Sequence, residues 1–275
     1  MNGIITNTSA NTELRVPYLG FSPSGLLAEE TRADSRYNSF QARVAHRFHA
    51  GLRFQFSYTF SKSMDDSSGG QTSIFAEVTG DESNISGSKG ISDFDRTHRA
   101  VLHFGYEIPA FGLAKTAFGQ RVFAGWEVSG VAIGQSGTPF SITGSGGAVF
   151  YGTAGSRANY ASGATRETAQ GTGPVESRVN AYFNIAAFAR AGNFFGNIGR
   201  NTMRGPGQRN VDISVNKRIP VTERVKAEFR SEFFNVMNLV NFASPSGAIA
   251  SAGFGAIKAT DGNSRVIQFA VKLTF

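Results

Sequence analysis

The feature that most constrains the fold of this chain is a regular alternation of apolar and polar residues over long segments. In LRFQFSYTF, from Leu52 to Phe60, every other residue is leucine, phenylalanine or tyrosine, and the residues between them are arginine, glutamine, serine or threonine. A period of two is typical of a β-strand with one apolar and one polar side. We expect seven such strands, at 36–48, 51–63, 97–108, 122–136, 209–218, 224–236 and 264–275.

The composition agrees with many strands and long irregular loops. The chain has 275 residues, with 33 Gly, 25 Phe and 17% charged residues. It has no cysteine, which excludes disulfides and thiolate metal sites. The net charge of +7 comes from scattered Lys and Arg, so we do not predict nucleic-acid binding. No run of about 18 apolar residues is present, which excludes a transmembrane helix.

The length of the strands favours a membrane-spanning wall over a soluble sandwich. Most of the segments run about 9–12 residues, longer than the usual five or six. At about 3.3 Å per residue and a tilt near 45°, 11 residues rise about 25 Å, the height of the apolar band of an outer-membrane barrel. Aromatic residues cluster towards the strand ends, where a membrane interface favours them. We therefore predict an all-β, antiparallel transmembrane barrel with an up-and-down meander.

The connections between these strands alternate in length and predict an orientation. They contain about 2, 33, 13, 72, 5 and 27 residues in chain order. Bacterial outer-membrane barrels have short periplasmic turns and long extracellular loops. The last strand should then run inward and place Phe275 at the periplasmic rim.

The number of strands suggests that the chain belongs to something larger. Seven is odd, whereas bacterial barrels have an even number of strands, at least eight. The start MNGIITNTSANTELR shows no signal peptide. We expect the whole chain, 1–275, to be the C-terminal part of a larger barrel; a weak strand at 3–8 is the alternative that would complete a small one.

Seven phrases of the sequence resemble the C-terminal barrel of TonB-dependent outer-membrane receptors of the Oar-like type, which are abundant in acidobacterial proteomes. The phrases run from about residue 13 to the end and are ELRVPYLGFSPSG, YNSFQARVAHRF, GLRFQFSYTFSKSMDD, SDFDRTHRAVLHFGYEIP, GWEVSGVAIGQSGTPFSI, FFGNIGRNTMRGPGQRNVDISVNKR and ERVKAEFRSEFFNVMNLVNF. The resemblance implies a barrel of about 22 strands, of which about a third is present, filled by a plug that lies upstream with the TonB box.

The resemblance implies uptake of a large or scarce ligand across the outer membrane, without enzymatic activity or cofactors. Peptides, proteins and oligosaccharides are all conceivable ligands. The implied partners are membrane lipid, upstream strands, the plug, TonB through the upstream part, and the barrel-assembly machinery. That machinery would recognise a terminal signal formed by Phe269, Val271, Leu273 and Phe275. The alternatives are a stand-alone barrel acting as an adhesin or porin, and a soluble β-rich carbohydrate-binding module.

One strand carries a charged stripe on its polar side. Its members are Lys226, Glu228, Arg230 and Glu232. In a barrel they would face the watery lumen, where they could contact a plug or a ligand. We expect them instead to pair across strands with Asp212 and Arg218 and stiffen the wall.

Four aspartates in one long loop are weak candidates for a metal site. They are Asp65, Asp66, Asp93 and Asp95. Clustered carboxylates suit a hard cation such as calcium. No EF-hand spacing is present, and we favour turn-capping aspartates that pair with Arg96 or Arg99.

The longest connection, 137–208, is the best ligand-facing candidate. Its aromatic residues include Phe140, Tyr151, Tyr160, Tyr182 and Phe183. Binding loops often sit on rigid scaffolds, but these rings could equally pack the loop on itself. No serine-nucleophile motif is present, and GSGG at 144–147 lacks the context of a phosphate-binding loop.

Overall fold

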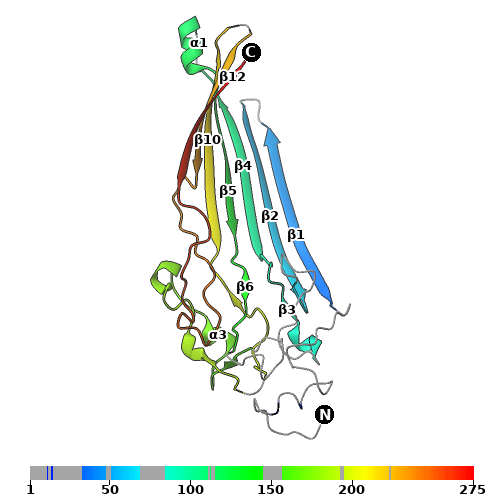
Figure 1. Cartoon of the computed structure of the whole chain (residues 1–275). Coiled ribbons are helices and arrows are strands. Elements are labelled where there is room, and N and C mark those ends of the chain that lie inside the picture. Colours follow the sequence, from blue (N-terminus) through cyan, green and yellow to red (C-terminus); the bar gives the residue numbers. More distant parts are fainter. Residues whose placement is uncertain are drawn as a thin grey trace.

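All seven predicted strands are present in the computed structural model (Figure 1). The structure describes Asn11, Leu14 and residues 33–47, 51–68, 84–110, 112, 115–144, 157–192, 195–222 and 224–275. The weak strand considered at 3–8 lies outside the described residues. The long strands are β1 (Ser35–Arg47), β2 (Leu52–Asp65), β4 (His98–Ile108), β5 (Trp126–Gln135), β10 (Gln208–Pro220), β11 (Lys226–Phe234) and β12 (Val266–Thr274).

These strands form one antiparallel meander, as predicted. Their order in the sheet is β1-β2-β4-β5-β10-β11-β12, so consecutive long strands are neighbours. The short strand β3 (Gly90–Ile91) adds to the end of β2. Among the described strands, β1 pairs with β2 alone and β12 pairs with β11 alone. The sheet formed by the described strands is therefore open, and they do not close into a barrel.

The register keeps all seven strands in phase. Phe56 is opposite Leu102, Leu102 opposite Ala132, and Ala132 opposite Val211, so these four side chains share one face. We call this side the apolar face and the other the polar face. Because residues opposite each other lie on the same side of a sheet, the alternation in each strand adds up to one continuous apolar surface.

Among the described residues, no second sheet covers the apolar face. Large side chains on it remain exposed, including Phe40 at 62%, Phe269 at 65% and Val271 at 69%. A soluble sandwich would bury such side chains against a second sheet. Among the described residues, no helix has the length and hydropathy needed to cross a membrane.

Strand β5 differs from its prediction at its start. The segment 122–136 was expected to be strand throughout, but helix α1 (Ala117–Phe123) occupies its first residues. The helix begins here because the Thr116 side chain accepts a hydrogen bond from the Gly119 N–H, which caps its N-terminus.

Strand β5 continues without a bulge through Gly130. Gly130 is opposite Phe104 on β4 and Ile213 on β10, and both ladders run through it without interruption. A Cβ at Gly130 would lie 2.7 Å from Phe104 Cζ and 2.6 Å from the Asp212 carbonyl oxygen. The glycine therefore makes room for the Phe104 ring and does not break the strand.

The two ends of the sheet differ, as the loop lengths predicted. One end, the turn end, carries α1, the C-terminus and the strand ends that the short connections join (Figure 1). The opposite end, the loop end, carries the described parts of the long connections, 66–68, 84–97, 136–144, 157–192, 195–207 and 235–265.

The loop end contains the hydrophobic core of the described chain. Its short elements are η2 (Ile85–Ser88), β6 (Pro139–Phe140), β7 (Asn159–Tyr160), α3 (Arg166–Ala169), η3 (Val175–Arg178), η4 (Ile185–Ala187), β8 (Phe188–Ala189) and β9 (Met203–Arg204). Strand β6 pairs with β9, and β7 pairs with β8. The buried cluster they enclose consists of Ile142, Ala158, Ala169, Tyr182, Phe183, Ala187, Phe188, Ile198 and Met203. The long loops thus form a packed body at one end of the sheet.

Candidate functional site

The polar face carries ion pairs that cross several strands. Arg53 on β2 reaches over β4 and pairs with Glu127 on β5. It passes Gly105 on β4, where a Cβ would lie 2.8 Å from the guanidinium. Arg218 on β10 binds the other carboxylate oxygen of Glu127 at 2.9 Å. A single buried carboxylate therefore joins β2, β5 and β10 on the polar face.

The charged stripe on β11 lies on the polar face. The expected pairing of this stripe across strands, with Asp212 and Arg218, is wrong. Arg230 lies 3.9 Å from carboxylate oxygens of both Glu228 and Glu232, so these pairs run along the strand. Although the register places Arg218 opposite Glu228, Arg218 pairs with the buried Glu127. The other expected partner, Asp212, accepts hydrogen bonds from amide groups and makes no ion pair with another described residue.

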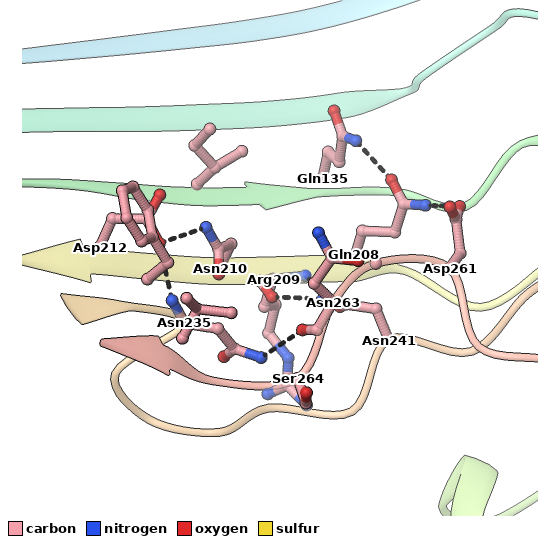
Figure 2. A pocket seen from close by; sticks show the side chains of 14 residues that line it. Gln135, Gln208, Arg209, Asn210, Asp212, Asn235, Asn241, Asp261, Asn263 and Ser264 are labelled. Atoms are coloured by element: carbon pink, nitrogen blue, oxygen red, sulfur yellow. Dashed lines mark hydrogen bonds between the residues drawn. The ribbon is translucent and has the colours of Figure 1, made fainter. Parts of the chain in front are cut away.

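A polar pocket lies on this face near the loop end (Figure 2). Its volume is about 570 Å³, and its walls come from β5, β10, β11, β12 and the connection between β11 and β12. Six of its lining residues are amides, namely Gln135, Gln208, Asn210, Asn235, Asn241 and Asn263. The others include the carboxylates Asp212 and Asp261 and the apolar residues Ile133, Phe234 and Val266. The pocket thus offers hydrogen-bonding groups beside an apolar patch.

Two hydrogen bonds hold three side chains of one pocket wall in place. Gln135 Nε2 donates to Gln208 Oε1 at 2.6 Å, and Gln208 Nε2 donates to the Asp261 carboxylate. Figure 2 shows these three side chains in a row, joined by the two hydrogen bonds. Side chains fixed in this way lose little conformational entropy when a ligand binds.

Asparagines from one short repeat fix the opposite wall. Asn235 has a positive φ of 49°, its Oδ1 accepts from the Leu239 N–H, and its Nδ2 donates to the Asn263 carbonyl. Asn241 exchanges two hydrogen bonds with the backbone of Arg209, at 2.7 and 2.8 Å. The alternation of apolar and polar residues did not predict this pocket. The sequence feature that could have indicated the pocket is the regular spacing of asparagines at 235, 238 and 241, directly after β11.

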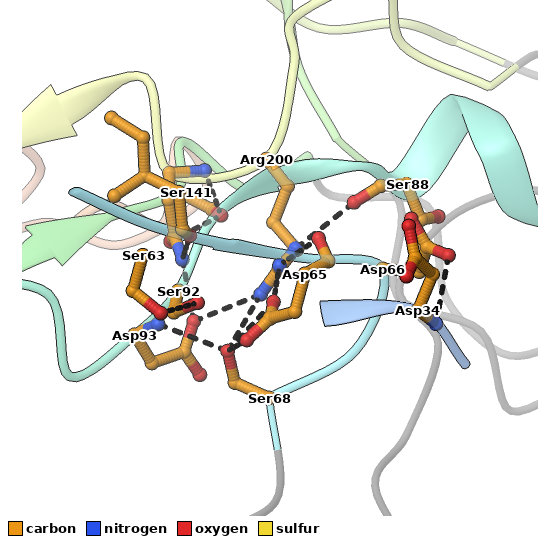
Figure 3. A network of polar contacts seen from close by, with 12 residues as sticks. Asp34, Ser63, Asp65, Asp66, Ser68, Ser88, Ser92, Asp93, Ser141 and Arg200 are labelled. Atoms are coloured by element: carbon orange, nitrogen blue, oxygen red, sulfur yellow. Dashed lines mark hydrogen bonds and ion pairs between the residues drawn. The ribbon is translucent and has the colours of Figure 1, made fainter. Parts of the chain in front are cut away.

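Two of the candidate metal-binding aspartates converge on a buried arginine (Figure 3). The side chain of Arg200 is 6% exposed and pairs with Asp65 and, at 3.2 Å, with Asp93. It also donates to the carbonyls of Ser88 at 3.0 Å and Asp65 at 2.7 Å. A guanidinium therefore lies where a cation bridging the two carboxylates would have to bind.

The other two candidate aspartates have different partners. Asp95 pairs with Arg204 at 2.7 Å, and Asp66 Oδ2 accepts from the Asp34 N–H at 3.2 Å. The expected pairing with Arg96 or Arg99 is wrong: Arg96 donates to the Ser136 carbonyl at 2.7 Å. No group of three or more His, Cys, Asp or Glu able to hold a metal is found in the described part of the chain.

The aromatic residues of the longest loop pack against one another. Tyr182 and Phe183 are buried, and Phe140 and Tyr160 pack against the same core. The ring of Phe183 meets that of Phe188 edge-on, with 5.4 Å between the centroids. These rings therefore pack the loop on itself, which was one of the two expectations. The fifth candidate, Tyr151, lies outside the described residues.

The surroundings of Tyr182 fit an interior position. Burial raises the pKa of its hydroxyl, and the charge of nearby Arg178 acts in the opposite direction. The Arg178 guanidinium carbon lies 4.2 Å from the centre of the Tyr182 ring. Tyr182 is thus a neutral, structural side chain at physiological pH.

The predicted terminal signal lies on the apolar face. Phe269, Val271 and Leu273 alternate along β12 and are exposed, and Phe275 follows in the same phase. The rings of Phe269 and Phe229 stack with their centroids 6.1 Å apart. The apolar surface therefore continues to the edge of the sheet.

Comparison with known proteins gives a family. A family model described as outer membrane beta barrel domain matches residues 2–268. No curated protein and no solved structure matches the chain. The family points to the outer membrane, which agrees with the meander sheet and its exposed apolar face. It argues against a soluble carbohydrate-binding module. The chain belongs to the outer membrane beta barrel domain family.

Proposed function

We propose that the chain forms part of the wall of a TonB-dependent outer-membrane receptor and acts in ligand uptake, not in catalysis. The apolar face would contact lipid, the polar face would line the lumen, and the loop end would face the outside of the cell. The plug and the segment that contacts TonB would belong to the same receptor. The resemblance of the sequence to Oar-like receptors supports this choice within the family.

The observation that carries the proposal is an open sheet with one apolar and one polar face. Each edge strand pairs on one side only among the described strands, and unpaired backbone groups are costly in a bilayer. Further strands beside β1 and β12 would remove that cost. A receptor barrel of about 22 strands supplies them.

The pockets on the polar face favour a wide barrel over a small one. The interior of an eight-stranded barrel is just wide enough for its own side chains. Here the polar face carries the amide-lined pocket of about 570 Å³ and a second pocket of about 430 Å³ nearer the turn end. The second is lined by Arg43, Arg47, Arg53 and His103, among others. Open pockets on the inner face suit a lumen that admits a ligand.

The amide-lined pocket is the proposed contact for the ligand. It lies at the loop end, where a ligand from outside would arrive first. Each amide can both donate and accept a hydrogen bond, and Phe234 adds an apolar surface beside them. Such a lining, which also contains Arg209, Asp212 and Asp261, suits a polar ligand that forms several hydrogen bonds.

Binding to TonB tests the proposal. The full gene product that contains this chain would be purified from its native outer membrane and mixed with the periplasmic domain of TonB. We expect a complex that cross-links through a segment upstream of the barrel. A product that does not bind TonB, and that changes its gel mobility on boiling as a small complete barrel does, would support the stand-alone alternative and contradict the proposal.

A further inference from the structure

Helix α1 is held on the apolar face of the sheet at the turn end. Its attachment comes from Trp126 and Lys217, which lie opposite each other on that face. Trp126 Nε1 donates to the Val122 carbonyl at 2.9 Å. Lys217 Nζ donates to the same carbonyl at 3.0 Å and to the Ala124 carbonyl. The C-terminal end of the helix is therefore anchored on the side of the sheet that faces lipid in a barrel.

Lys217 explains why the helix lies there. A lysine on the lipid-facing side costs about 2–4 kcal/mol at the bilayer midplane and little near an interface. Lys217 is 4% exposed, and its Nζ is satisfied by helix carbonyls and lies 5.1 Å from the centre of the Trp126 ring. Cations favour the C-terminal end of a helix, where carbonyls are unpaired. The lysine thus fixes the helix at the boundary of the apolar surface.

The helix leaves its apolar side chains partly exposed, although Gly119 on the same side is buried. At about 100° per residue, Phe118, Val122 and Phe123 fall within one arc, and Gln120 and Arg121 fall outside it. Phe118 is 75% exposed and Phe123 42%. A short amphipathic helix with exposed phenylalanines is typical of a segment lying in a membrane interface.

The charges around α1 are positive. Lys115 and Arg121 are exposed, and the connection 109–125 contains no aspartate or glutamate. Lys and Arg beside an apolar helix face attract anionic lipid headgroups. A tryptophan at the same level, Trp126, fits the aromatic belt of a membrane protein.

We propose that α1 is an interfacial helix that binds the phospholipid surface of the periplasmic leaflet. Phe118, Val122 and Phe123 enter the boundary of the acyl chains, and Lys115 and Arg121 contact phosphates of anionic phospholipids. The apolar face of the sheet, exposed to lipid at the same level, continues into this surface. The inference rests on the outer-membrane placement of the chain and is independent of TonB.

The absence of cysteine from the chain allows a direct test. Phe118→Cys and Gln120→Cys would each be labelled with an environment-sensitive fluorophore in the full chain, reconstituted in vesicles. The vesicles would contain phosphatidylcholine with lipids brominated either just below the headgroups or near the chain ends. Gln120 is the matched control, because it is exposed and lies outside the apolar arc of the same helix.

We expect bromines near the headgroups to quench the label at position 118 at least about twofold more than the label at 120. Bromines near the chain ends should have less effect. Equal quenching at both positions, or none at 118, would overturn the proposal and indicate a helix in water or one covered by protein.

A second arm tests the preference for anionic lipid. Phosphatidylglycerol would be added to the vesicles, and the labelled protein compared with its Lys115→Gln/Arg121→Gln variant. We expect quenching at 118 to rise with phosphatidylglycerol in the parent and to stay constant in the variant. A rise of the same size in both proteins would overturn the role of the two cations.

Discussion

At the residue scale, Arg200 holds together segments that are far apart in the sequence. Its guanidinium binds Asp65 at the end of β2, Ser88 in η2 and Asp93 before β4. These contacts fasten the longest loop to the loop between β2 and β4. Removing one partner of a buried ion pair leaves a charge without compensation, which costs about 3–5 kcal/mol.

We therefore expect Arg200→Ala to loosen the loop end without unfolding the sheet. Backbone amides of residues 63–68 and 87–93 should exchange with deuterium at least about tenfold faster, as a loss of a few kcal/mol implies. Arg190→Ala is the control, because Arg190 is exposed in the same loop. Unchanged exchange in the Arg200 variant would show that the network does not hold the two loops together.

Gly130 and Gly134 provide a matched pair on one strand and one face. A Cβ at Gly130 would meet Phe104 and the Asp212 carbonyl at under 3 Å, whereas a Cβ at Gly134 meets nothing within 4 Å. Gly130→Ala should therefore lower the free energy of unfolding by about 1–3 kcal/mol through overpacking. Gly134→Ala should change it by less than about 0.5 kcal/mol. Urea titration of the folded protein in detergent would measure both, and equal effects would contradict the packing described at Gly130.

At the element scale, α1 shows what alternation alone could not predict. The strands follow from the sequence because a period of two is a local property of each segment. The start of β5 was misplaced because the residues before Trp126 are apolar enough for a strand. A threonine cap and the bonds from Lys217, a residue of β10, hold them in a helix instead.

Lys217→Ala should release the C-terminal end of α1. The carbonyls of Val122 and Ala124 would lose their donor, and trypsin should then cleave after Arg121 several times faster in detergent-solubilised protein. Lys226→Ala, on the polar face at the same end of the sheet, is the control. Cleavage after Arg121 at the parental rate in the Lys217 variant would show that this lysine does not anchor the helix.

The candidate sites were harder to predict than the strands because they depend on contacts between distant residues. Asp65 and Asp93, two aspartates of the metal prediction, share Arg200, but Arg200 and Arg204 lie more than 100 residues away from the aspartates in the chain. The amide-lined pocket has walls from four strands and a loop. Alternation gives the face of each of these residues but not which of them meet at one end of the sheet.

At the scale of the whole molecule, the chain is a wall with two different faces and a packed body at its loop end. A charge on the lipid side near mid-membrane costs about 2–4 kcal/mol, and a charge on the lumen side costs little. The neighbouring residues Ile213 and Ser214, in the middle of β10, lie on opposite faces.

Ile213→Arg should therefore prevent insertion into the outer membrane, and Ser214→Arg should be tolerated. The amount of each protein in the outer-membrane fraction, relative to the parent, measures the effect. Equal amounts of the two variants would mean that the face carrying Ile213 does not contact lipid.

The central claim, that one face contacts lipid and the other faces water, is tested most directly by a cysteine scan along β2. Single cysteines at Gln55, Phe56, Ser57, Tyr58 and Thr59 would be introduced into the cysteine-free chain in native outer membranes. Each would be treated with a water-soluble maleimide. The account predicts labelling at 55, 57 and 59 and protection at 56 and 58, where a lipid-quenchable probe should report contact with acyl chains. Equal labelling at all five positions would contradict it.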